Sequence, residues 1–311
     1  APPDNPYTYQ RHVYDLSRPE NLAFLQELRA LMDEYPGTTT VGEIGDDFPL
    51  QRMAEYTSGG DKLHMAYTFD LLNEPHSPDY IRGVIERLES KVADGWPCWA
   101  LSNHDVVRSA SRWGQGEDPQ LYPRVALAML MSLRGSVCLY QGEELGLPEA
   151  EVAFEDLQDP YGIEFWPEFK GRDGCRTPMV WTNDNTYGGF SETRPWLPVS
   201  LEHGALAVAE QEANPDALLH HYRRVIALRR AHAALSRGSH DAVAASGTVV
   251  SFTRSAEGED IFCAFNLSDQ DAEVTLPAGT WDQLGAEIGT ATISGARVKL
   301  APWQACLARR A

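Results

Sequence analysis

Two stretches of the sequence place a carboxylate where an apolar run stops. Glu43 lies in the stretch Val41–Ile44, and Asp105 ends the stretch Leu101–Asp105, which follows the apolar run at 98–101. In a parallel β-barrel such positions form the rim, where stiff strands hold catalytic groups that face an open mouth. Apolar neighbours disfavour the charged form of a carboxyl, so Glu43 is predicted to be a proton donor at neutral pH. Taken singly, either residue also fits an ordinary loop acid, whereas the pair favours a catalytic site.

An alternation of strands and helices is predicted to position these carboxylates. Four β-rich runs are expected as strands, at positions 38–41, 64–69, 98–101 and 136–140. Helical periodicity begins at a capping-box pattern, Ser17–Glu20, and again at about Pro49, Ser77, Asp118–Pro119 and Asn214–Pro215. Strands and helices that alternate at this spacing require parallel crossovers. The connection at positions 141–214 is far longer than an ordinary βα loop, so it is either a functional wall or an inserted subdomain.

The last part of the chain has a different texture. Short alternating runs separated by turn residues predict strands at 248–253, 261–265, 272–276, 291–293, 297–300 and 305–308. This pattern is typical of a small antiparallel β domain. The candidate chemistry is confined to the part before it.

The composition limits the classes of partner. The chain has 311 residues, with 45 acidic against 26 basic side chains, and this excess of negative charge disfavours nucleic acid and anionic membranes. Its five cysteines are widely spaced, which predicts reduced, buried thiols and a cytoplasmic location. No spacing suggests a metal site, and no apolar run approaches the roughly 20 residues of a membrane span. We expect a neutral ligand and no cofactor.

The order of four short motifs resembles one known family. Gly42-Glu43-Ile44 is followed by Asn103-His104-Asp105, then by Tyr-Gln-Gly-Glu-Glu at 140–144 and Arg-Asp-Gly-Cys-Arg-Thr-Pro-Met at 172–179. The chain closely resembles the α-amylase superfamily of glycoside hydrolases, and within it the bacterial exo-acting α-glucosidases. The resemblance covers essentially the whole chain. It implies an α/β fold, in which residues 1–235 form the C-terminal half of a (β/α)8 TIM barrel, with the long loop 141–214, and residues 236–311 form a small antiparallel β domain.

The resemblance also implies roles for individual residues. Glu43 is the expected general acid/base, and Asp105 is the carboxylate that binds sugar hydroxyls in the distorted transition state. His104 is expected to hydrogen-bond the same sugar, and Arg172 to close the pocket around the non-reducing glucose. An alternative for Arg172 is a loop-fixing ion pair with Asp173 or Glu168.

Other residues lie near these motifs. Phe69 either offers an apolar face to the leaving sugar or packs in the core. Glu143 and Glu144 are interpreted as structural, orienting the rim. The nearby acids Asp46, Asp47 and Asp70 match no catalytic motif.

The family's nucleophile is not found in this sequence. It is an Asp within Gly-Phe-Arg-x-Asp on the fourth barrel strand, and no such motif occurs here. Four strands are half of an eight-stranded barrel and would leave apolar edges unpaired. We therefore expect this chain to be the C-terminal portion of a larger enzyme whose N-terminal half supplies the nucleophile; a half-barrel homodimer is the alternative.

These features predict a retaining exo-α-glucosidase that acts on maltose-like oligosaccharides, with some glucosyl transfer to other hydroxyl acceptors. A sibling that acts on sucrose or trehalose shares every motif. A catalytically silent scaffold or binding relative is the alternative of another class, and it should have lost Glu43 or the Asn103–Asp105 motif.

Overall fold

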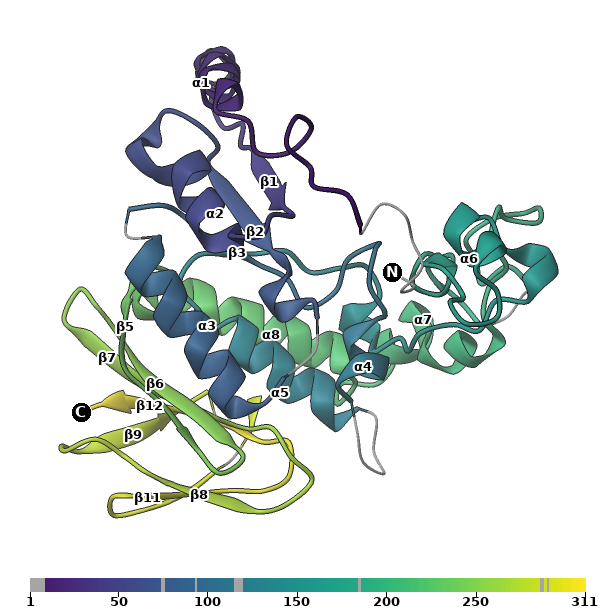
Figure 1. Ribbon diagram of the computed structural model, residues 1–311. Helices are drawn as coiled ribbons and strands as arrows, with labels where there is room; N and C mark the ends of the chain where they lie inside the picture. The colour runs from purple at the N-terminus through teal and green to yellow at the C-terminus, as the bar shows by residue number, and fades with distance from the viewer. Residues whose placement is uncertain are drawn as a thin grey trace. The chain divides into compact units, whose positions relative to one another are not determined.

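The computed structural model describes residues 9–73, 76–92, 94–114, 120–183, 186–285, 288–289 and 291–311 (Figure 1). The chain divides into two compact units. The strand unit comprises His12–Ala100, Val125–Cys138 and Val225–Ala311, and the loop unit comprises Ala1–Arg11, Leu101–Arg124 and Leu139–Arg224.

Four short parallel strands lie in the strand unit. β1 (Val41–Ile44) pairs with β2 (Met65–Thr68), and β3 (Cys98–Trp99) pairs with β4 (Ser136–Val137). A parallel bridge between Ala66 and Pro97 connects the two pairs. The four predicted strands are therefore present in chain order and run parallel. β1 starts at Val41 rather than at position 38, which places Glu43 inside the strand.

Helices separate these strands as the periodicity predicts. The long helices are α1 (Glu20–Asp33), α2 (Pro49–Thr57), α3 (Pro78–Lys91), α5 (Leu121–Leu130) and α8 (Leu218–Ala231). The shorter ones are α4 (Ser109–Arg112), α6 (Pro160–Glu164), α7 (Val208–Glu212) and α9 (Ala233–Arg237). The 3₁₀ segments are η2 (Ser58–Gly60), η3 (Phe69–Leu71), η4 (Glu143–Leu145), η5 (Phe154–Asp156), η6 (Asp173–Cys175) and η7 (Leu201–Leu206).

The start of α3 agrees with its sequence signal, because Ser77 accepts a hydrogen bond from the Tyr80 amide at 3.2 Å and Pro78 occupies the first turn. The capping box predicted for α1 is wrong. Pro19 occupies the cap position without a side-chain bond, and the Ser17 hydroxyl donates to Asp46 instead.

Two other helix starts differ from expectation or cannot be compared. α8 begins at Leu218 because a turn precedes it, in which the Asp216 and Ala217 amides donate to Asn214. The predicted start of α5 at Asp118–Pro119 lies outside the described residues.

Two antiparallel sheets form the end of the chain. The larger has the order β5-β6-β7-β12-β9 and the smaller the order β10-β11-β8. Their strands are β5 (Ser239–Ser246), β6 (Val249–Ala256), β7 (Glu259–Asn266), β8 (Ala272–Thr275), β9 (Trp281–Leu284), β10 (Thr292–Ser294), β11 (Arg297–Leu300) and β12 (Ala305–Arg310). β5 and β9 were not expected, and β5 escapes the pattern because most of its residues are exposed and small or polar.

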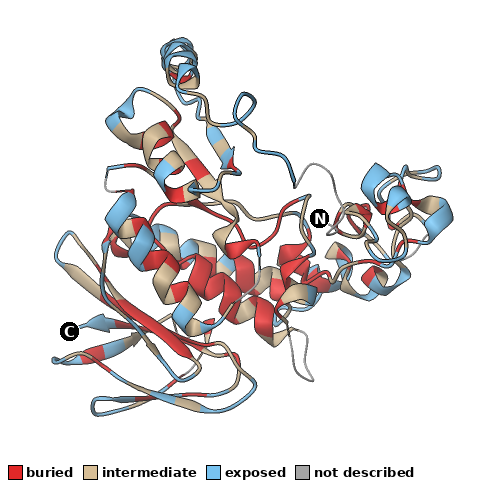
Figure 2. Cartoon of the chain, in the orientation of Figure 1, coloured by how far each residue is buried: buried red, intermediate tan, exposed pale blue. Residues whose placement is uncertain are grey.

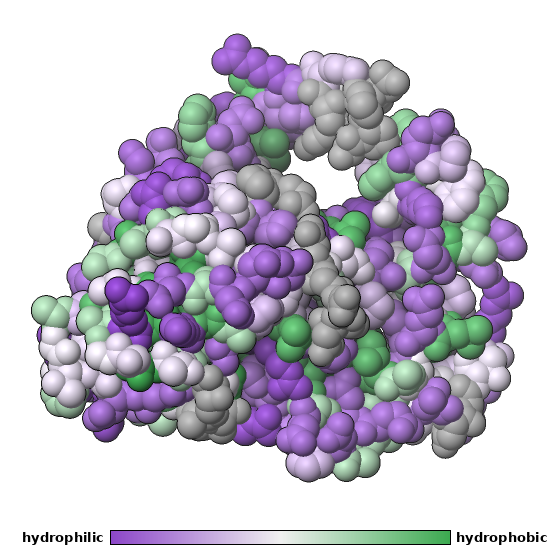
Figure 3. All heavy atoms as spheres, turned by 90° about the horizontal axis from the view of Figure 1, so that it is seen from below, coloured by the Kyte–Doolittle hydropathy of each residue, from purple (hydrophilic) through white to green (hydrophobic). Residues whose placement is uncertain are grey.

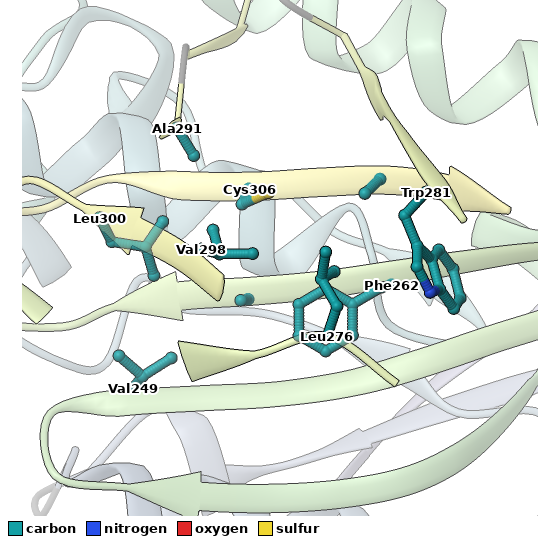
Figure 4. Close-up of a cluster of buried hydrophobic side chains, with 10 residues drawn as sticks. Val249, Phe262, Leu276, Trp281, Ala291, Val298, Leu300 and Cys306 are labelled. Carbon is teal, nitrogen blue, oxygen red and sulfur yellow. The ribbon is translucent and has the colours of Figure 1, made fainter. Parts of the chain in front are cut away.

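The core of this region lies between the two sheets. Val249, Phe262 and Cys306 of the larger sheet pack with Val298 and Leu300 of the smaller one (Figure 4). Inner strands β6 and β7 are mostly buried, as is the apolar face of α3, which packs on β5 and β6 (Figure 2). The predicted antiparallel β region is therefore confirmed as an element of the fold.

Two arginines fix the ends of helices in the strand unit. Arg254 of β6 is fully buried, and its guanidinium donates to the carbonyls of Ser132, Leu235 (2.9 Å) and Gly238 (2.6 Å). Arg229 of α8 donates to Leu235 as well, at 2.7 Å, and to three carbonyls that follow α5. Carbonyls at a helix C-terminus lack partners in the helix, so these cations satisfy and join the ends of α5 and α9.

The surface is mainly polar where Figure 3 shows it, with hydrophobic residues in small separate groups. Within the described ranges, no helix combines the length and the apolar character that crossing a bilayer demands. The five cysteines are free thiols; Cys138 is half-buried and the other four are buried.

Candidate active site

The loop that carries Asp105 follows β3 and is fixed along its length. The Asp105 amide donates to Asn103 Oδ1 at 2.8 Å, and the Ser109 amide donates to Ser102 Oγ at 2.9 Å. Arg112 binds the Leu101 carbonyl at 2.6 Å. The Asn103 contact is a local turn of the kind that Asn side chains commonly form, whereas the Ser102 contact closes the loop across seven residues.

Two arginines bind the Asp105 carboxylate. Arg172 Nη1 and Arg176 Nη2 both donate to Asp105 Oδ1, at 2.9 and 2.8 Å, while Oδ2 takes no part in these two contacts. Arg176 Nε also donates to the His104 carbonyl at 2.7 Å. The carboxylate remains 29% exposed. An acid held in this way is fixed in place yet open to a ligand.

A buried acid, Asp159, orients Arg172. Arg172 Nε and Nη2 donate to the two Asp159 oxygens at 2.9 and 3.0 Å, in a bidentate pair. Hydrogen bonds from Arg172 hold the pKa of Asp159 below its usual value. The Tyr161 ring lies 5.7 Å from the guanidinium and supports it from one side.

Arg172 does form ion pairs, but with other acids than the alternative predicted. Its partners are Asp159 and Asp105 rather than Asp173 or Glu168. Asp173 instead accepts the backbone amides of Gln158 and Asp159, at 2.6 and 2.8 Å. Asp159 precedes Pro160 at the start of α6, and this Asp-Pro pair was the sequence signal that could have marked it as a fixed acid.

His104 lies beside the same carboxylate. Its Nε2 is 3.6 Å from Asp105 Oδ1, and its side chain is 58% exposed. The structure therefore brings His104, Asp105 and Arg172 together in the loop unit. Their contact with a sugar stays a prediction.

Glu43 and Phe69 belong to the strand unit, and their convergence with Asp105 stays a prediction. The expected burial of Glu43 among apolar neighbours is wrong for this chain: Glu43 is exposed, and Val41 is 50% exposed. The reason is that β1 is paired only with β2 in the part of the chain that the structure describes. Phe69 opens the turn after β2, and its ring centre lies 6.4 Å from that of Tyr67, a packing contact.

Two of the other acids near these strands, Asp46 and Asp70, have structural partners. Asp46 accepts the Phe48 amide at 2.7 Å and pairs with Arg52 at 3.3 Å. Asp70 accepts the Thr68 hydroxyl at 2.5 Å. Among the described residues, no group of three or more His, Cys, Asp or Glu side chains is arranged to hold a metal ion.

Two buried charged residues of the loop unit, Glu143 and Arg108, were not predicted from sequence. Glu143 is almost fully buried, and burial raises its pKa to about 7 against the opposing hydrogen bond from Ser102. Arg108 is also buried, and its amide donates to Glu149 Oε2 at 2.8 Å. The interpretation of Glu143 as structural stays a prediction.

Two family models and several known proteins match this chain. Residues 1–238 match the family model described as "Alpha amylase, catalytic domain", and residues 242–307 match "Maltogenic Amylase, C-terminal domain". The chain is 50% identical to a probable alpha-glucosidase of Rhizobium meliloti (strain 1021), covering 100% of this chain and 57% of the relative. It is 27% identical to an oligo-1,6-glucosidase of Heyndrickxia coagulans, covering 94% of this chain and 59% of the relative.

Solved structures give the same picture. The alpha-glucosyl transfer enzyme XgtA is similar with a TM-score of 0.93 and 47% identity, covering 99% of this chain and 57% of that one. The trehalulose synthase MutB from Pseudomonas mesoacidophila MX-45 has a TM-score of 0.81 and 25% identity, covering 94% and 59%. The chain thus spans less than two thirds of the length of these relatives. The expected fold class is confirmed, namely the C-terminal part of a TIM-barrel catalytic domain with an antiparallel β region after it, and the chain belongs to the α-amylase family.

Proposed function

We propose that the enzyme containing this chain is a retaining exo-α-glucosidase that releases glucose from the non-reducing end of maltose-like oligosaccharides and also transfers glucosyl groups to other acceptors. The observation that carries the proposal is the Asp105 carboxylate, fixed by Arg172 and Arg176 beside His104 yet partly open. Transfer is supported by the similarity to an alpha-glucosyl transfer enzyme.

In this proposal Glu43 protonates the leaving oxygen and Asp105 binds sugar hydroxyls as the ring distorts toward the transition state. Retention requires a second carboxyl about 5–5.5 Å from the acid, as the nucleophile. The N-terminal half of the same enzyme supplies it and completes the barrel. Arg172 limits the pocket around the terminal glucose, and Phe69 borders the leaving sugar. Residues 236–311 form a separate C-terminal domain. The free thiols support a cytoplasmic location.

A sucrose-acting sibling is the second candidate, because a trehalulose synthase is among the similar structures. Rates of the full-length enzyme on maltose, isomaltose, sucrose, trehalose and starch separate the two. Preference for maltose, with α-glucose as the first anomer seen by NMR, is the expected result. Preference for sucrose establishes the sibling, and activity on long starch alone contradicts the exo mode.

The role of Glu43 is tested by Glu43→Gln in the full-length enzyme. We expect hydrolysis of maltose to fall at least about 1000-fold, because the amide cannot donate the proton. Glu27→Gln, an exposed acid on α1, is the matched control and should keep full activity. Unchanged hydrolysis in Glu43→Gln would show that Glu43 is not the general acid, whereas a wild-type enzyme that hydrolyses no α-glucoside would favour the scaffold interpretation.

A further inference from the structure

The backbone carbonyl of Cys175 accepts hydrogen bonds from two side chains. Cys175 is fully buried, and its carbonyl accepts hydrogen bonds from Arg108 Nη2 at 2.9 Å and from the Tyr140 hydroxyl at 3.0 Å. The next residue is Arg176, which binds Asp105. The position of this carbonyl therefore sets where the Arg172–Arg176 segment presents its guanidinium groups.

Arg108 connects this carbonyl to two other loops. Its Nη1 donates to the Gln141 carbonyl at 2.7 Å, and its own amide donates to Glu149 Oε2 at 2.8 Å. The Tyr140 ring lies 5.2 Å from the guanidinium, so the two donors to Cys175 also pack against each other. Arg108 is only 2% exposed. A planar, five-donor cation buried among carbonyls is well suited to fix three loops at once.

Arg108 also lies three positions after Asp105 in the sequence. It therefore holds the Asp105 loop on one side and the Cys175 carbonyl on the other. The guanidinium of Arg108 and the hydroxyl of Tyr140 bind backbone carbonyls rather than the Asp105 carboxylate.

We propose, building on the proposed function, that Arg108 and Tyr140 are positioning residues: through the Cys175 carbonyl they hold Arg176 and Arg172 at hydrogen-bond distance from Asp105. A displacement of about 1 Å in a catalytic constellation is enough to cost about 100-fold in rate. The geometry of the Asp105 site is set by these two side chains together with the loop that carries it.

The test uses Tyr140→Phe and Arg108→Lys in the full-length enzyme with maltose as substrate. Tyr140→Phe removes one hydrogen bond and keeps the ring, so kcat should fall about 5-fold, with KM changed less than about 2-fold. Arg108→Lys keeps the charge but loses the fork, and kcat should fall about 100-fold. Arg223→Met, an exposed arginine of α8, is the control and should leave both constants unchanged.

A double-mutant cycle separates positioning from general stability. In an Asp105→Asn background the Tyr140→Phe effect on kcat should shrink below about 2-fold, because the contact through which it acts is already weakened. Full additivity of the two changes overturns the proposal, as does an unchanged kcat in both single variants.

A crystal structure of full-length Arg108→Lys gives a readout without activity. The Arg176 Nη2–Asp105 Oδ1 separation, 2.8 Å here, should exceed hydrogen-bond range in the variant while staying short in the wild type. An unaltered separation overturns the positioning role. A wild-type enzyme inactive on every α-glucoside would overturn the proposed function instead, and the same separation would still decide the positioning role.

Discussion

Asp105 is the residue that joins the hydrogen bonds of the candidate site. Its Oδ1 accepts from two guanidinium groups, and one of these is itself held by the buried Asp159. Charge-assisted hydrogen bonds of this kind fix both direction and distance. A change of charge at this position should therefore alter the site more than a change of the same size elsewhere on the loops.

The first prediction is that Asp105→Asn lowers kcat/KM on maltose at least about 100-fold in the full-length enzyme. The amide has nearly the same shape, but it loses the negative charge and leaves two cations facing a neutral group. Steady-state kinetics measure the loss. Asp216→Asn, an exposed acid in the same unit, is the control, and an Asp105→Asn enzyme within about 2-fold of wild type would contradict the assignment.

The second prediction concerns Glu143. Because burial raises its pKa from 4.5 to about 7, the folded state keeps a proton that the unfolded state releases between those pH values. Stability then falls as pH rises across this window, by up to about 1.4 kcal/mol per pH unit, and levels off above it.

Glu143→Gln is neutral at every pH and avoids this loss. The melting temperature of the variant relative to wild type should therefore rise between about pH 4.5 and 7 and stay constant above. Thermal unfolding of both proteins in matched buffers is the measurement. Parallel curves across the window would show that Glu143 is ionised in the folded state.

At the residue scale, the sequence predicted which residues lie together at the candidate site better than it predicted their burial and their partners. The Asn103–Asp105 motif and Arg172 were recognised, and they lie together as neighbours of one carboxylate. Asp159 as the partner of Arg172 was missed, because ion pairs across 13 positions of an irregular loop depend on its path. The burial of Glu43 was wrong, because exposure depends on which strands lie beside β1.

At the element scale, the arginines of the strand unit join helix ends to strands. The Arg254 guanidinium is enclosed by carbonyls after α5, in and after α9, and by the Ser239 carbonyl at 3.1 Å. A buried carbonyl without a donor costs about 1–3 kcal/mol. Neither helical nor strand periodicity predicts that such an arginine is buried. From sequence, a lone arginine in an apolar strand suggests an exposed position at the edge of a sheet.

The third prediction is that Arg254→Met lowers the free energy of unfolding by at least about 3 kcal/mol, because several buried carbonyls lose their donor at once. Arg230→Met, an exposed arginine at the end of α8, should change it by less than about 0.5 kcal/mol. Thermal or denaturant unfolding of the full-length protein compares them. Equal melting temperatures for the two variants would show that water replaces the guanidinium.

Element types were predictable where periodicity is strong, as in α3 and the inner strands β6 and β7. Boundaries were less so, because they depend on turns such as the one before Leu218. The exposed strand β5 was not predicted, since its pairing with β6 is made by the backbone rather than by an apolar face.

At the scale of the whole molecule, the chain corresponds to 57% of the length of its 50% identical relative. β1 carries an exposed Val41 and pairs on one side within the described residues. An apolar parallel strand with an open edge is a site for further pairing or for aggregation. The N-terminal half of the enzyme is the partner we propose for it.

The fourth prediction is that residues 1–311 expressed alone do not give a soluble, cooperatively folding monomer, whereas co-expression with the N-terminal half does. Covering the open edge of β1 removes the driving force for aggregation. Size-exclusion chromatography and thermal unfolding of both preparations test this. A monomer of the isolated chain with a single sharp transition would contradict it.

The carbonyls that surround the Arg254 guanidinium also limit how such enzymes can be recombined. A chimera that exchanges the terminal sheets between two relatives would import a new β6 while retaining the old α5 and α9. Unless the imported sheet has an arginine at the position of Arg254, the carbonyls at the ends of α5 and α9 lose their hydrogen-bond donor in the chimera. The exchangeable module is therefore larger than the sheets themselves, and a crossover placed ahead of α5 keeps cation and carbonyls from one parent.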